Sequence, residues 1–251
     1  MKPKKSSKVL VLGLTLFALQ AVAQQTDHQG FAVEANGKRL VVRPQTPAEA
    51  YEYLQQTLSQ MSFFDANGYD VSLPDHQGFD EEGETGSLST FADEVYRETD
   101  FASAMAVLHE RKPMLQQALK WFSTLDDSLS FYVPKEYTVV LTLYGPGGSY
   151  NPESATITML TTPDGRFKGG GGAHTIVHEM MHIAVEEALV QRFDLSHWEK
   201  ERLVDVLCQR ELGSLLTDYR QQPLGDVRFG EAVADVPLAG LAAALRAYKN
   251  R

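Results

Sequence analysis

The stretch AHTIVHEMMHIAVEEALV, residues 173–190, is the most informative segment of this chain for predicting its fold and its site. It contains neither glycine nor proline, so one uninterrupted helix is expected. His178 and His182 stand four residues apart in it, so their side chains project from one face roughly 6 Å apart along the axis. Two imidazoles so placed can bind one Zn²⁺ ion, and Glu179 stands where it can take a proton from water.

A zinc site that keeps one open position needs a third protein ligand. The capping box at residues 196–199 predicts a second helix that runs to about Leu216. Glu201 and Asp205 stand four residues apart near its apolar stripe, where a carboxylate is costly unless it is paired or bound to metal. We therefore expect Glu201 to be the third ligand and Asp205 to accept a hydrogen bond from a ligating histidine.

Glu186 is the alternative third ligand, because it continues the row of the two histidines by one more turn. It lies about 12 Å along the axis from His178, which puts it out of comfortable reach of a metal held between the rings. His174 lies one turn upstream of His178, so it is too far along the axis in the opposite direction to be the third ligand. Glu186, Glu187 and His174 are therefore interpreted as helix-face residues.

An H-E-x-x-H helix followed, 19 residues after its second histidine, by E-x-x-x-D on the next helix resembles the gluzincin, or thermolysin-like, clan of zinc metallopeptidases. The resemblance covers about residues 150–210. It implies three zinc ligands, His178, His182 and Glu201. It also implies that Glu179 is the general base and that Asp205 orients a zinc-binding histidine.

One part of the gluzincin pattern is missing, namely a downstream His or Tyr that donates to the oxyanion. No histidine follows His197. Tyr219 is available, but a straight helix from Glu201 would place it about 27 Å away. Arg228 and Tyr248 are no better supported, so this gap weakens the case for proteolysis more than the case for zinc binding.

Two strand-like segments, residues 137–144 and 154–161, are rich in Thr, Val and Ile and flank a Gly-Pro-Gly-Gly turn. They are candidates for a long-looped hairpin. Tyr150-Asn151-Pro152 followed by residues 154–160 also resembles the edge strand that precedes the zinc helix in compact gluzincins, which binds an extended peptide by strand addition. An interior strand with both edges paired is an equal alternative.

The N-terminal half reads as a hairpin and helices. Asn36-Gly37 is a hairpin turn signal, and the capping box at residues 46–49 predicts a helix to about Phe63. Residues 64–88 read as a solvated loop, with calcium binding by its acidic residues 80–84 disfavoured. Residues 90–124 read as two helices broken near Pro113. The predicted fold class is α+β: a helical N-terminal half on a small, mainly antiparallel sheet, followed by the two-helix zinc site.

The chain has 251 residues and a formal charge of −10, which argues against a nucleic-acid partner. A basic head, a short apolar run and Ala21-Val22-Ala23 predict a signal peptide over residues 1–23, cleaved after Ala23. Its removal leaves 19 basic and 33 acidic residues, a charge of −14. Two regions are then expected, residues 24–130 and 131–251. Cys208 is the single cysteine, so no disulfide can form within an exported chain.

These patterns favour an exported zinc metallopeptidase, periplasmic or secreted, that hydrolyses peptides or proteins and has no membrane partner once the leader is removed. The alternative is a zinc-binding pseudo-peptidase that kept the site for stability or partner binding. A weaker third interpretation is a secreted helical protein in which the motif is accidental. The substrate and the oligomeric state stay open.

Overall fold

The computed structural model describes residues 30–66, 68–76, 78–79, 86–125, 130–168, 171–219, 221 and 227–250. The predicted leader, with its cleavage after Ala23, and the acidic residues 80–84 lie outside these ranges. Within the described ranges, none of the helices has the length and apolar character that crossing a bilayer requires.

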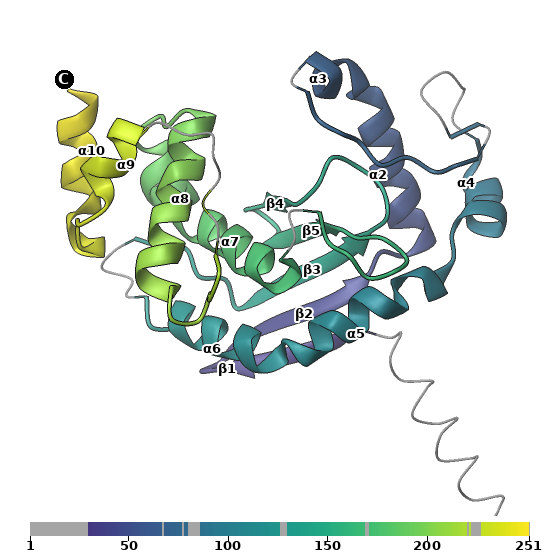
Figure 1. Ribbon diagram of the computed structural model, residues 1–251, viewed down its shortest axis with the longest axis horizontal. Coiled ribbons are helices and arrows are strands. Elements are labelled where there is room, and N and C mark those ends of the chain that lie inside the picture. The colour runs from purple at the N-terminus through teal and green to yellow at the C-terminus, as the bar shows by residue number, and fades with distance from the viewer. Residues whose placement is uncertain are drawn as a thin grey trace, which may run out of the picture.

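A five-stranded sheet with the order β1-β2-β3-β5-β4 forms the centre of the fold (Figure 1). Its strands are β1 (Phe31–Ala35), β2 (Lys38–Pro44), β3 (Glu136–Thr142), β4 (Ser149–Asn151) and β5 (Thr156–Leu160). The predicted hairpin turn is confirmed: Asn36 and Gly37 both have positive φ and join the antiparallel strands β1 and β2. β2, β3 and β5 run parallel, and β4 runs antiparallel to β5.

The prediction of a mainly antiparallel sheet is therefore wrong, because two of the four pairings are parallel. The expected hairpin between residues 137–144 and 154–161 is wrong for the same reason. The chain leaves β3, reaches the edge of the sheet in β4 and returns into β5. The Asn151 side chain stabilises the turn between β4 and β5, because it accepts hydrogen bonds from the backbone N–H groups of Glu153 and Ser154. The expectation of an edge strand over residues 154–160 is wrong, because β5 pairs with both β3 and β4; among the described residues the edge strand is β4.

The helices form two groups along the chain, one between β2 and β3 and the other after β5. Before β3 they are α2 (Pro47–Ser59), α3 (Met61–Ala66), α4 (Leu88–Thr90), the π-helix η1 (Phe91–Val95), the 3₁₀ helix η2 (Glu98–Phe101), α5 (Ala102–Glu110) and α6 (Lys112–Phe122). After β5 they are α7 (Gly172–Val185), the π-helix η4 (Glu186–Gln191), α8 (His197–Leu212), α9 (Val227–Val233), the 3₁₀ helix η5 (Leu238–Gly240) and α10 (Leu241–Lys249).

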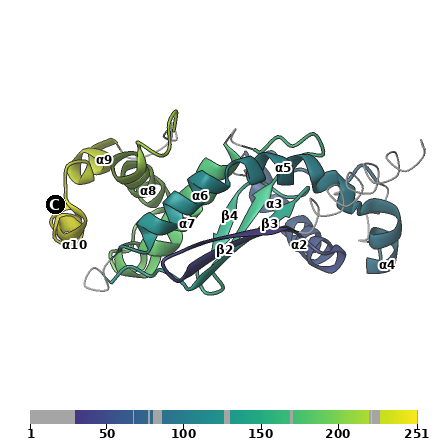
Figure 2. The ribbon, with the colours of Figure 1, turned by 90° about the horizontal axis from the view of Figure 1, so that it is seen from below.

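Helices cover one face of the sheet. α6 packs on β1 and β2, and α7 packs on β4 and β5, as Figures 1 and 2 show. The strand residues that face these helices are fully or almost fully buried: Leu40, Val42, Tyr137, Val139, Leu141, Ile157 and Met159. Thr138, Thr156 and Thr158 alternate with them on the other face and are only half-buried.

The N-terminal helices largely follow their local signals. Thr46 and Glu49 form both bonds of the predicted capping box at α2. The break near Pro113 is also confirmed, since α5 ends at Glu110 and α6 begins at Lys112. α2 ends earlier than predicted, at Ser59, and α3 follows it. A second, smaller core lies between α2 and η1 and contains Ala50, Leu54, Phe79, Phe91 and Tyr144.

The predicted boundary at residue 130 falls between neighbouring strands of one sheet, because β2 pairs with β3. The main core likewise draws on both regions, with Leu40 and Leu119 in the same cluster as Val139 and Val204. The C-terminal helices extend this body: α8 packs on α7 and α9, and α9 packs on α10.

Candidate metal centre

α7 carries the two histidines of the H-E-x-x-H motif in the interior of the protein. It is apolar on most sides, because it lies against β4, β5, α6 and α8. His178 and His182 are 8% and 1% exposed, and they occupy one face, as their spacing predicts. The helix continues past Val185 as the π-turns of η4, a change of winding that the sequence did not signal.

α8 supplies the carboxylates. It begins at the predicted capping box, in which Ser196 and Glu199 make both reciprocal hydrogen bonds. Glu201 and Asp205 lie on its buried side and are 7% and 1% exposed. Buried carboxylates require partners, and both of these find theirs on or near α7.

Three ligand atoms converge between α7 and α8. The Nε2 atoms of His178 and His182 lie 3.0 Å apart. Glu201 Oε2 lies 3.4 Å from the first of these nitrogens and 3.3 Å from the second. Among the described residues, this is the one His/Cys/Asp/Glu group of three or more whose geometry could hold a metal ion.

The separations fit a metal ion. Ligand atoms about 2.0–2.1 Å from a tetrahedral centre lie about 3.3 Å from one another. His182 Nδ1 is buried and has no hydrogen-bond partner among the described residues, so only its Nε2 is engaged, and that atom faces the group. The buried His178-His182-Glu201 group can therefore bind a metal ion.

Tyr219 connects Asp205 to His178. Its hydroxyl donates to Asp205 Oδ1 at 2.7 Å and lies 2.6 Å from His178 Nδ1. The direct separation between Asp205 Oδ1 and His178 Nδ1 is 3.7 Å, too long for a hydrogen bond. Asp205 therefore makes its hydrogen-bonded connection to the histidine through the phenol, in place of the expected direct hydrogen bond.

Tyr150 of β4 lies over the other histidine. Its ring stacks on that of His182, and its hydroxyl donates to Glu186 Oε2 at 2.7 Å. Lys200 Nζ donates to the same hydroxyl at 3.2 Å. Glu186, the alternative third ligand, is thus engaged with Tyr150 and is not part of the converging group; neither is His174.

Glu179 lies beneath the segment that leads into the edge strand. A Cβ atom at Gly148 would lie 3.2 Å from Glu179 Oε1, so the carboxylate approaches the backbone closely there. Gly148 and Ser149 are exposed, whereas Glu179 is 8% exposed. No backbone hydrogen bond among the described residues joins residues 149–151 to a segment other than β5, so the outer edge of β4 is open beside Glu179.

The electrostatics suit a cation at this centre. Burial is the main cause that lowers the pKa of His182, to about 4, so its ring is neutral and offers a lone pair. Burial opposes ionisation of Glu201, but hydrogen bonds with His178 and His182 prevail and hold its carboxyl pKa well below the usual range. Burial raises the pKa of Glu179 to about 7.

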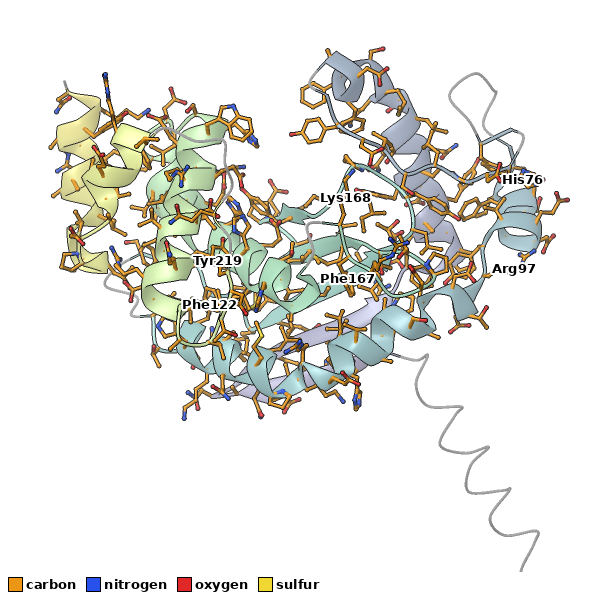
Figure 3. The ribbon with its side chains drawn as sticks, in the orientation of Figure 1. His76, Arg97, Phe122, Phe167, Lys168 and Tyr219 are labelled. Carbon is orange, nitrogen blue, oxygen red and sulfur yellow. The ribbon has the colours of Figure 1, made fainter. Side chains whose placement is uncertain are left out.

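The structure thus brings together all five residues singled out in the sequence, and adds two tyrosines. A straight helix from Glu201 would carry Tyr219 about 27 Å away. Instead, α8 ends at Leu212 and the following residues fold back along it, which places Tyr219 beside α8 and next to α7 (Figure 3). Gly213 directly follows the last residue of α8, but its backbone is right-handed helical, so it is not the left-handed glycine that commonly ends a helix. The sequence places Tyr150 in a candidate edge strand but does not indicate that its ring stacks on His182.

Comparisons with models of protein families, with curated proteins and with solved structures find no match to this chain.

Proposed function

We propose that this chain is an exported zinc-dependent metallopeptidase of gluzincin type. The observation that carries the proposal is the convergence of His178, His182 and Glu201 next to Glu179 and an open strand edge. The predicted leader supports export. The acidic body argues against acidic partners such as nucleic acid.

Two imidazoles and one carboxylate are the donor set of catalytic zinc sites that keep a fourth position open. His178, His182 and Glu201 would hold the ion. The chemistry that zinc supplies in such a site is Lewis acidity, which acidifies water and polarises a carbonyl. Glu179 would accept the proton of the attacking water and pass it to the nitrogen of the leaving amine as the C–N bond breaks.

Two further side chains lie beside the ligand group and could donate to a substrate carbonyl oxygen. Lys200 Nζ is 3.8 Å from Glu201 Oε1, and His197 Nδ1 is 4.0 Å from the same atom. The side chain of His197 is 51% exposed, so it can turn toward a bound substrate. We assign to Lys200 and His197 the role of donating hydrogen bonds to the oxyanion.

The edge strand supports a peptide substrate. Ser149 and Asn151 are exposed, and an extended peptide could add to β4 through backbone hydrogen bonds. A peptide paired there would run past Gly148 and so pass over Glu179. This arrangement would place a peptide bond near the proton acceptor.

The test compares Glu179→Gln with Glu187→Gln, a matched change at an exposed position of η4. We expect both variants to bind zinc like the wild type, while only Glu179→Gln loses cleavage of a peptide library, by roughly 10²–10⁴-fold. Metal analysis and mass spectrometry of the digests measure the two outcomes. Equal cleavage by Glu179→Gln and the wild type would exclude this mechanism.

A second candidate function is a zinc-binding pseudo-peptidase. It is favoured by the position of Tyr219, whose hydroxyl is engaged by His178 and Asp205 and is not free to donate to an oxyanion. In that case the metal contributes folding free energy alone. Zinc binding with no turnover on any library, in wild type and Glu179→Gln alike, would establish it.

A further inference from the structure

The contact between Asp205 and His178 departs from the arrangement that the sequence predicts. Asp205 Oδ1 and His178 Nδ1 are 3.7 Å apart, and the Tyr219 hydroxyl bridges these two atoms at 2.7 and 2.6 Å. Asp205 is 1% exposed and His178 is 8% exposed, so water does not readily replace the phenol.

The direction of both hydrogen bonds follows from the single proton of a phenol. The Tyr219 hydroxyl donates this proton to the Asp205 carboxylate, which has no proton of its own to give. The oxygen then accepts from His178, which must carry its proton on Nδ1. That tautomer leaves the lone pair on Nε2, the atom that faces His182 and Glu201.

We infer that Tyr219 is a positioning residue of the metal centre, which fixes the tautomer and ring orientation of His178 on behalf of Asp205. The inference rests on the proposed metal site but not on peptidase activity. A neutral phenol, rather than a carboxylate, is then the direct acceptor from the ligand. The segment between α8 and Tyr219 becomes part of the site, because it carries this residue back to α7.

The test measures zinc dissociation constants by competition with a chromophoric chelator. Tyr219→Phe removes the acceptor and should weaken zinc binding about 10–100-fold. Asp205→Asn keeps an oxygen that accepts from Tyr219, so it should cost less than Tyr219→Phe. The double variant should bind about as weakly as Tyr219→Phe alone, since both changes interrupt one chain of hydrogen bonds.

Two controls separate positioning from general damage. Tyr51→Phe removes a phenol hydrogen bond to Gly86 in the smaller core and should leave zinc affinity unchanged. The visible spectrum of the Co²⁺-loaded protein should change in Tyr219→Phe but not in Tyr51→Phe, because only the former turns a ligand ring. The metal-free variants are checked for folding by their melting temperatures.

The outcomes are distinguishable. If the wild type binds zinc and His178→Ala abolishes binding, the metal site stands. Wild-type affinity in Tyr219→Phe, or a larger loss in Asp205→Asn than in Tyr219→Phe, would then overturn the positioning role alone. A wild type that binds no zinc would overturn both the site and this inference.

Discussion

The ring of Tyr150 stacks on the ring of His182, with centroids 4.8 Å apart and 9° between the planes. The contact joins the edge strand to a candidate metal ligand. The same tyrosine is held by Glu186 of η4 and Lys200 of α8. Three elements therefore fix one ring against His182, whose Nδ1 has no hydrogen-bond partner among the described residues. The two histidines are supported differently, one by a hydrogen bond and the other by stacking.

Substitutions at Tyr150 should separate the ring from its hydroxyl. Tyr150→Ala removes the stacked ring and should weaken zinc binding by up to about 10-fold, since such ring pairs contribute about 0.5–1.5 kcal/mol. Tyr150→Phe keeps the ring, so its effect on the zinc dissociation constant should be smaller. Equal losses in the two variants would show that the hydroxyl network, rather than stacking, orients His182.

Gly148 should be sensitive to the addition of a single methyl group. Its Cβ would lie 3.2 Å from both Glu179 Oε1 and Thr175 Cγ2, so Gly148→Ala must displace one of these side chains slightly. Both side chains can move, and the fold should keep its melting temperature. Misplacement of a catalytic group by 1 Å can lower the reaction rate about 10²-fold. The displacement of Glu179 expected here is smaller, so we expect kcat to fall by about 10-fold.

The matched control for Gly148→Ala is Glu153→Ala, an exposed change next to the same strand. It should leave kcat unchanged. An unaltered kcat in Gly148→Ala would argue that the Glu179 carboxylate does not need its observed position.

Local signals were enough to predict the helices that build the site. The H-E-x-x-H spacing places two imidazoles on one face, and the capping box at Ser196 fixes where α8 begins. Glu201 and Asp205 could be chosen because a carboxylate near an apolar stripe needs a partner. These inferences use spacing within one helix or a single cap, and such spacing is set by backbone geometry alone.

The errors concern relationships between distant segments. The Thr, Val and Ile content of residues 137–144 and 154–161 identifies strands, but it carries no information on whether they run parallel. The position of Tyr219 depends on where α8 ends. A Cβ at Gly213 would lie 2.2 Å from the Gln209 carbonyl oxygen, but the Gly213 backbone stays helical, and the residue with positive φ in this segment is Asp218, directly before Tyr219. Neither Gly213 nor Asp218 indicates in the sequence that Tyr219 returns to His178.

The pairing of Arg43 with Glu49 should make stability depend on pH in acid. Arg43 donates to both carboxylate oxygens, at 2.7 and 2.6 Å, and this is the main cause that lowers the pKa of Glu49 from 4.5 to about 2. Because the folded pKa is depressed, the stabilisation is complete above the unfolded value. It is lost as the pH falls from about 5 toward 2.

Glu49→Gln isolates this charge effect, because glutamine can still complete the capping box with Thr46. The pair is partly exposed, so we expect a loss of about 1 kcal/mol in the free energy of unfolding at pH 7. Urea titrations at pH 7, 5 and 3 should show the difference from wild type shrinking as the pH falls. A difference that is as large at pH 3 as at pH 7 would contradict the ion-pair origin.

Removal of the metal should destabilise the fold, because the ligands come from both α7 and α8. Zinc at about 1,000 times its dissociation constant would contribute about 4 kcal/mol. For a chain of this size that corresponds to a fall of roughly 8–16 °C in melting temperature when a chelator is added. His178→Ala should melt at the same temperature with and without chelator. Calorimetry of both proteins measures the melting temperatures. A wild-type melting temperature that does not change when the chelator is added would mean that His178, His182 and Glu201 hold no metal that couples α7 to α8.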